Sequence, residues 1–146
     1  MNMRSLHSAK YAAVLVFLAV LAGCGTKGGT EQVATGADPV LHASIDAPAP
    51  GSQIKGKFVV GGWAFATGGV VQEISVYVDG KKAVIAATHG ARPDVAQQFP
   101  EPDAAQSGWY SEIDGSTLAA GKHEISVRAT LAGGGEKSLG TVSVTK

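Results

Sequence analysis

Short segments in which every second residue is apolar fill the chain from Leu41 to its last residues. In such a segment the apolar side chains share one face, which is the pattern of a strand with one buried side. Glycine and proline separate the segments, and nothing after Leu41 carries a helical period for more than a turn or two. The pattern predicts strands at residues 41–46, 57–65, 71–79, 83–88, 109–113, 123–130 and 139–144.

The segment 57–65 is apolar on both faces, so we expect a central strand or one that is covered on both sides. Asp79-Gly80, at the end of the next segment, is the preferred pair for a two-residue hairpin turn, because both positions need a positive φ. About seven short strands in about 105 residues are typical of a β-sandwich. The predicted fold class is therefore all-β, an antiparallel, immunoglobulin-like (Ig-like) sandwich.

The start of the chain follows another pattern. Residues 1–10 are basic, residues 11–22 are continuously apolar, and small residues follow, as in a secretory signal peptide. Twelve apolar residues are too few to span a bilayer as a helix, which needs about 20. Leu21-Ala22-Gly23-Cys24 resembles the lipobox of bacterial lipoproteins at all four positions.

The lipobox resemblance implies that residues 1–23 are cleaved off and that Cys24 becomes the first residue, carrying a diacylglyceryl thioether and an N-acyl chain such as palmitate. Two or three acyl chains hold a protein on a membrane permanently. Gly25 stands where an aspartate often marks inner-membrane retention. The resemblance therefore implies the outer membrane, on its periplasmic or surface face, if the host has two membranes. The alternative is an ordinary signal peptide followed by a free cysteine.

Residues 25–40 are rich in Gly and Thr and have no apolar period, so we expect a flexible tether with a reach of about 22 Å. The predicted organisation is a signal peptide at 1–23, the lipidated cysteine and linker at 24–40, and one Ig-like domain at 41–146. Since Cys24 is the sole cysteine, a disulfide within the chain is excluded.

Net charge narrows the class of partner. The signal peptide holds Arg4 and Lys10 and no acidic residue, so ten basic and twelve acidic residues give residues 24–146 a net charge of −2. This weakly acidic balance argues against nucleic acid or an anionic membrane surface as a partner.

Several motifs resemble those of the bacterial Ig-like domains found in secreted and surface proteins. They are Ala47-Pro48-Ala49-Pro50-Gly51, Gly62-Trp63-Ala64-Phe65, the run from Val71 to Gly80 that ends in Val78-Asp79-Gly80, and the run from Leu118 to Ala129 that contains Gly121-Lys122-His123. The resemblance covers nearly everything after Ile45. It implies a sandwich that serves as a spacer or a binding module.

The connection at residues 89–106 is longer than most loops in compact domains. Asp94 is predicted to cap a single helical turn that Pro100 ends, with Val95 and Phe99 on one side of it. We expect Val95 and Phe99 to lie against the sheet near Trp63 or Trp109. The connection is either a structural lid or a recognition loop that offers Arg92 and Asp94.

Aromatic residues are the main candidates for ligand contacts. Trp63 lies on the face of its strand opposite the residues that are expected to point inward. It is therefore either buried under the long connection or an exposed stacking platform. Trp109 and Tyr110 are neighbours on one strand and point to opposite faces, so at most one of them is in the core. Tyr77 lies on an outward face. The candidate binding residues are Trp63, Tyr77, Arg92, Asp94, Phe99, Trp109 and Tyr110.

Nothing in the sequence indicates catalysis. No acid/base pair, metal-ligand spacing, nucleophile motif or phosphate loop is present. His7 leaves with the signal peptide, and His42, His89 and His123 are far apart in the chain. His123 is at the start of a strand after Gly121, and we expect it to form a hydrogen bond with nearby backbone. The expected protein is not an enzyme and needs no cofactor or metal.

Three functions follow, in order of preference. The first is a lipid-anchored, monomeric, non-catalytic Ig-like module of the bacterial envelope that binds a protein or glycan partner. The second is a carbohydrate-binding module that uses exposed aromatic residues. The third, a small envelope hydrolase or inhibitor, would depend on His89, Asp94 or His123.

Overall fold

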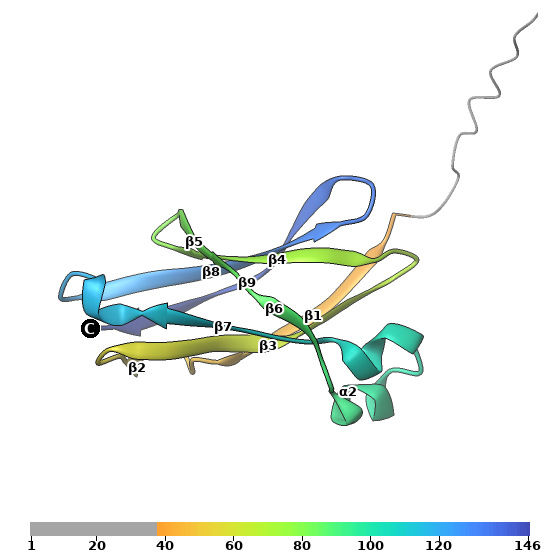
Figure 1. Ribbon diagram of the computed structural model, residues 1–146, viewed down its shortest axis with the longest axis horizontal. Helices are drawn as coiled ribbons and strands as arrows, with labels where there is room; N and C mark the ends of the chain where they lie inside the picture. Colours follow the sequence, from red (N-terminus) through yellow and green to blue (C-terminus); the bar gives the residue numbers. More distant parts are fainter. Residues whose placement is uncertain (1–37) are drawn as a thin grey trace, which may run out of the picture. The chain divides into compact units, whose positions relative to one another are not determined.

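A computed structural model describes residues 38–146, and within them two β-sheets are stacked face to face (Figure 1). Sheet A has the strand order β1-β3-β7-β6, and sheet B has the order β2-β9-β8-β4-β5. The strands of sheet A are β1 (Val40–Ala47), β3 (Lys57–Thr67), β7 (Gly108–Asp114) and β6 (Ala87–Gly90). Those of sheet B are β2 (Ser52–Gln53), β9 (Gly135–Thr145), β8 (Lys122–Leu131), β4 (Val71–Val78) and β5 (Lys81–Ile85).

Within residues 38–146, helical structure is confined to short connections. The segment between β6 and β7 holds α2 (Pro93–Gln98) and the 3₁₀ helix η1 (Pro102–Gln106), and a second 3₁₀ turn, η2 (Gly115–Thr117), follows β7. The predicted all-β sandwich is confirmed. One detail differs from the expectation of purely antiparallel pairing, because β2 pairs in parallel with β9.

Alternation along the strands builds the core between the sheets, as predicted. Leu41, Ala43 and Ile45 of β1 point inward and pack against residues that are fully or almost fully buried. The largest side chains of this core that solvent does not reach are Val60, Ile74, Val76, Ile125, Val127 and Val144. The hairpin turn at Asp79-Gly80 also forms as predicted, with φ of 50° and 78°.

The predicted strand at 83–88 is wrong in one respect, because it is two strands in different sheets. The chain leaves β5 in sheet B, crosses at Ala86, and enters β6 in sheet A. Ala86 is buried, and its N–H donates to the carbonyl of Ile74 (2.9 Å), which still belongs to sheet B. An Ala-Ala pair carries no sequence signal for a change of sheet.

β3 lies in the interior of sheet A, between β1 and β7, and both of its faces are apolar as expected. Its inward residues join the core, and its outward residues Trp63 and Phe65 meet the segment that holds α2 and η1. We call that segment, residues 91–107, the insertion. Figure 1 shows it at one end of sheet A, on the side away from sheet B.

Candidate functional site

Four aromatic rings form a cluster on the outer face of sheet A. The register places His42 opposite Phe65 and Ser44 opposite Trp63, so these side chains share that face. His42 stacks on Phe65 with ring centroids 4.9 Å apart, and the ring of Phe99 lies 5.3 Å from Phe65 and 5.6 Å from Trp63. Phe99 comes from the insertion, so the cluster fastens the insertion to the sheet.

The insertion packs as a small second core. Val95, Phe65 and Ala104 are almost fully buried together, with Trp63 and Phe99 partly buried around them. The prediction that Val95 and Phe99 lie against the sheet near Trp63 is confirmed. The predicted cap is wrong: Arg92 occupies the N-cap position and no side chain caps the helix, because Asp94 lies inside the first turn and bonds Arg92 instead.

Arg92 clamps the insertion to β1. Its Nε and Nη2 donate to the two carboxylate oxygens of Asp94 (2.9 and 2.6 Å), and its Nη1 donates to Oδ2 of Asp46 (2.8 Å). These bonds to Arg92 lower the pKa of Asp94 to about 2. The two carboxylates raise the pKa of the Arg92 guanidinium, and Asp94 contributes more to this than Asp46. Both pKa shifts keep the groups charged, so the clamp persists across the physiological pH range.

Tyr110 and Trp63 are diagonal neighbours beside the insertion. Tyr110 lies opposite Gly61, and Trp63 lies opposite Gly108, so each aromatic residue faces a glycine across the β3–β7 ladder. Diagonal positions of this kind are about 7 Å apart. Tyr110 is 61% exposed and Val59, which precedes Gly61 on the same face, is 49% exposed. We call Val59, Trp63 and Tyr110 the aromatic face.

The structure therefore brings five of the seven candidate residues together: Trp63, Arg92, Asp94, Phe99 and Tyr110. Trp109 points the other way, as the alternation requires, and is 3% exposed in the main core. Tyr77 lies on the outer face of sheet B, where the guanidinium of Arg128 sits 4.7 Å from its ring centroid. Trp109 and Tyr77 therefore cannot contact a ligand that lies on the aromatic face.

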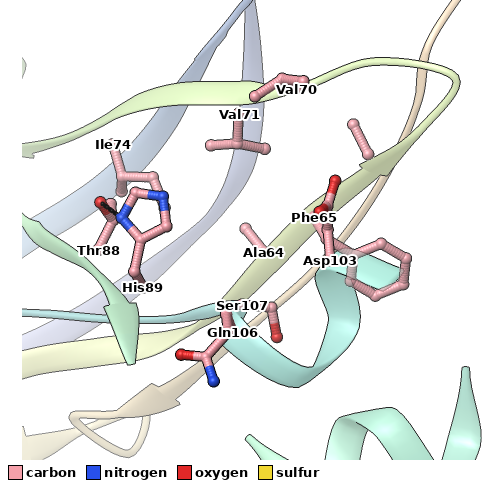
Figure 2. Close-up of a pocket in the computed structure, with 11 residues that line it drawn as sticks. Ala64, Phe65, Val70, Val71, Ile74, Thr88, His89, Asp103, Gln106 and Ser107 are labelled. Atoms are coloured by element: carbon pink, nitrogen blue, oxygen red, sulfur yellow. Dashed lines mark hydrogen bonds between the residues drawn. The ribbon is translucent and has the colours of Figure 1, made fainter. Parts of the chain in front are cut away.

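A cavity of about 140 Å³ opens between the sheets next to the insertion (Figure 2). Small side chains of β3 and apolar side chains of β4 form its floor, among them Ala64, Val71 and Ile74. His89 and Asp103 are among the polar residues that surround it. His89 has a φ of 66°, which is uncommon outside glycine, and a hydrogen bond joins its Nδ1 to Oγ1 of Thr88 (2.9 Å).

His123 makes the backbone bond that its position predicted, and a second bond that was not foreseen. Its Nε2 lies 2.8 Å from the carbonyl of Ala119, and its Nδ1 lies 2.7 Å from Oδ2 of Asp79. The Asp79 carboxylate, helped by that carbonyl, raises the pKa of the imidazole. The pKa of Asp79 is lowered, most by the hydrogen bond from the N–H of Glu124 and next by the bond to His123. These bonds tie the β4–β5 turn to the start of β8.

Sequence reasoning missed Asp46 and His42. Asp46 is far from Arg92 in the chain, and only the fold brings them into contact. His42 carried a usable signal, because it alternates with the inward residues Leu41 and Ala43 and must point outward. Among residues 38–146 no group of three or more His, Cys, Asp and Glu side chains is placed to hold a metal ion.

Two stacked, almost wholly antiparallel sheets with an Ig-type spacing of strands define the class of the protein as an Ig-like β-sandwich. A family model of the bacterial Ig domain matches residues 42–127, which is more than half of the chain. The chain therefore belongs to the bacterial Ig domain family. A comparison with curated proteins found no match.

Solved structures with a similar fold include the fibronectin(III)-like modules of CbhA from Clostridium thermocellum, with a TM-score of 0.49 and 16% identity. They also include the endo-β-1,4-mannanase of Thermotoga petrophila, with a TM-score of 0.47 and 14% identity. The matches cover 73% and 75% of this chain, but only 46% and 20% of those chains. This chain thus spans less than half of either structure.

Proposed function

We propose that this protein is a lipid-anchored, non-catalytic binding module of the bacterial cell envelope, and that its aromatic face receives a protein or glycan partner. Membership of the bacterial Ig domain family supports an extracellular or envelope location. Within residues 38–146 no helix is long and apolar enough to cross a membrane. The proposed anchor is Cys24, which lies outside the described residues, as do the signal peptide and the predicted tether up to residue 37. The last residue of the predicted tether, Val40, is the first residue of β1.

The observation that carries the binding proposal is the position of Tyr110. A tyrosine ring that is 61% exposed, diagonal to Trp63 and beside the exposed Val59, gives a flat apolar surface on a rigid sheet. Such surfaces on monomeric proteins often mark interaction sites. The clamp of Arg92 to Asp46 and Asp94 holds the insertion as a fixed border of this surface, which supports its role as a lid.

A glycan is the second candidate within this proposal, because aromatic side chains can stack on sugar rings and Tyr110 offers an open ring. Binding of purified envelope polysaccharides and of envelope proteins to the full chain is to be compared with binding to Tyr110→Ala. We expect Tyr110→Ala to lose about tenfold or more in affinity, the usual cost of an aromatic hot spot. Tyr77→Ala, on the opposite sheet, is the matched control and should bind normally.

The anchor is tested separately. Cys24→Ser should leave the precursor uncleaved and release the protein from membranes in fractionation. Unchanged membrane attachment of Cys24→Ser would refute lipidation. Equal binding by Tyr110→Ala and the wild type would refute the aromatic face as the contact surface.

A further inference from the structure

The crossing of the chain from β5 to β6 leaves part of one sheet edge open. Figure 1 shows the chain passing from sheet B into sheet A between these strands. β6 pairs with β7 only where Ala87 faces Tyr110 and Gly90 faces Gly108. In the described part of the chain, residues 111–114 of β7 therefore pair with β3 on one side and with no strand on the other.

The hydrogen bonds of β7 show which groups face this open side. The N–H of Ala64 donates to the carbonyl of Ser107 (2.9 Å). Because antiparallel residues alternate in direction, Trp109, Ser111 and Ile113 then bond β3, while the N–H and C=O of Glu112 point to the open side. The hydroxyl of Thr117 donates to the carbonyl of Asp114 (2.8 Å), so that group is already used.

A groove of about 550 Å³ runs along this open edge, between β7 of sheet A and β5 of sheet B. Its apolar lining comes from Val78, Val84, Ile113 and Leu118, of which Val84 and Leu118 are only partly buried. The groove thus offers both elements of strand recognition: free main-chain groups along one side, and a place for an apolar side chain between the sheets.

Charged side chains of both signs line the groove, and Lys81 is the cation left to pair with an occupant. Lys82 is paired with Glu73 (2.8 Å), and Glu112 with Lys57 (2.8 Å). Asp79 bonds His123, and the carboxylate of Asp114 accepts from Ser116 and remains, within the described part of the chain, a negative charge of the groove without an ion pair. Lys81 lines the same groove, and no ion pair to it occurs among residues 38–146.

We propose that a protein partner adds an extended peptide strand to sheet A at Glu112, with an apolar side chain in the groove and a carboxylate near Lys81. This inference goes beyond the proposed function, because the edge at Glu112 is a second contact surface next to the aromatic face. Another half-open edge, beside the start of β4, is less suitable. β4 is bulged between Val71 and Glu73, which breaks the regular spacing that an added strand needs.

The test uses the full-length chain and a library of short random peptides displayed on phage. Glu112→Pro removes the N–H that faces the open side and leaves the bonds between β7 and β3 in place, since proline is tolerated at such an edge position. We expect selected peptides to combine an apolar residue with Asp or Glu, and to lose about tenfold or more in affinity for Glu112→Pro. Glu112→Gln, which keeps the N–H, is the matched control and should bind normally. Lys81→Gln should bind about threefold or more weakly.

Amide hydrogen exchange of the wild type gives a second measurement that needs no variant. The Glu112 amide should exchange fast in the free chain and slowly with a selected peptide bound.

The proposal fails if the library yields no peptide, if selected peptides bind Glu112→Pro as well as the wild type, or if the free Glu112 amide is already protected. It also fails if Glu112→Pro abolishes self-association, because the edge would then serve a second copy. Peptides that lose binding only in Tyr110→Ala would refute the edge site and support the aromatic face.

Discussion

Among the glycines of residues 38–146, Gly62 is the one at which a single added methyl group would disturb the fold most directly. A Cβ built there would lie 2.0 Å from the carbonyl oxygen of Ser44 and 3.1 Å from the Cα of Ile45, both backbone atoms of β1. Backbone of a paired strand cannot move aside as a flexible side chain can. The glycine therefore permits β1 and β3 to approach closely next to the bulge at Ile45 and Ala47.

We predict that Gly62→Ala lowers the free energy of unfolding by about 3 kcal/mol, the upper part of the range for overpacking. Gly135→Ala is the control, because a Cβ there meets nothing within 4 Å and its φ is not in the left-handed region. It should change stability by less than about 0.5 kcal/mol. Denaturant unfolding followed by far-UV circular dichroism compares the two, and equal stabilities would contradict the steric explanation.

His123 makes the domain's stability depend on pH. Both of its ring nitrogens face acceptors, so only the protonated ring satisfies both bonds. Because the folded-state pKa is raised above its ordinary value of 6.5, this stabilisation is complete below pH 6.5 and is lost as the pH rises through the folded-state pKa. For Asp79, whose pKa is lowered from 3.8, the stabilisation is present above pH 3.8 and is lost as the pH falls through its folded-state pKa.

The stability difference between the wild type and His123→Gln should therefore be largest between pH 4 and 6.5 and should shrink toward pH 9. Thermal unfolding at a series of pH values measures it. Asp79→Asn serves as the partner variant in a double-mutant cycle, and it should remove most of the same pH dependence. A difference that stays constant from pH 5 to 9 would show that the charged pair does not contribute.

At the scale of elements, the strands could be predicted and their distribution between sheets could not. Alternation located β3 and its two apolar faces, and Asp79-Gly80 located a turn, because both are local properties of the chain. The crossing at Ala86 and the contact of Arg92 with Asp46 depend on how distant segments pack. The aromatic face could be predicted only in part, since the burial of Trp109 and the exposure of Tyr110 follow from which face of β7 is covered.

The clamp at Arg92 should control how often the insertion opens. Lysine keeps the positive charge but cannot bond both oxygens of Asp94 while reaching Asp46. We predict that Arg92→Lys speeds amide hydrogen exchange of residues 93–106 by about tenfold, with little change in the strands. Gln97→Ala, at an exposed position of α2, is the control. Unchanged exchange in Arg92→Lys would mean that the aromatic cluster alone holds the insertion.

At the scale of the whole domain, the two outer faces of the sandwich differ in character. Sheet A carries the aromatic face and the insertion. Sheet B carries charged and polar contacts, including Glu73 with Lys82 and Arg128 with Glu136. Since exposed ion pairs add little to stability, we expect substitutions of these four ion-paired residues to leave the fold stable. A partner on sheet A would contact a surface that the insertion borders.

The two tryptophans report on two parts of the domain with unequal stability. Trp109 belongs to the large core between the sheets, and Trp63 to the small cluster under the insertion. A cluster that buries less apolar surface opens at a lower free energy, so the insertion should detach before the sandwich unfolds. In denaturant, the fluorescence of Trp109→Phe, which retains Trp63, should change at a lower midpoint than far-UV circular dichroism. The fluorescence of Trp63→Phe should change together with the circular dichroism signal. Coincident midpoints in both variants would mean that insertion and sandwich unfold as one unit, and that the insertion is part of the rigid scaffold.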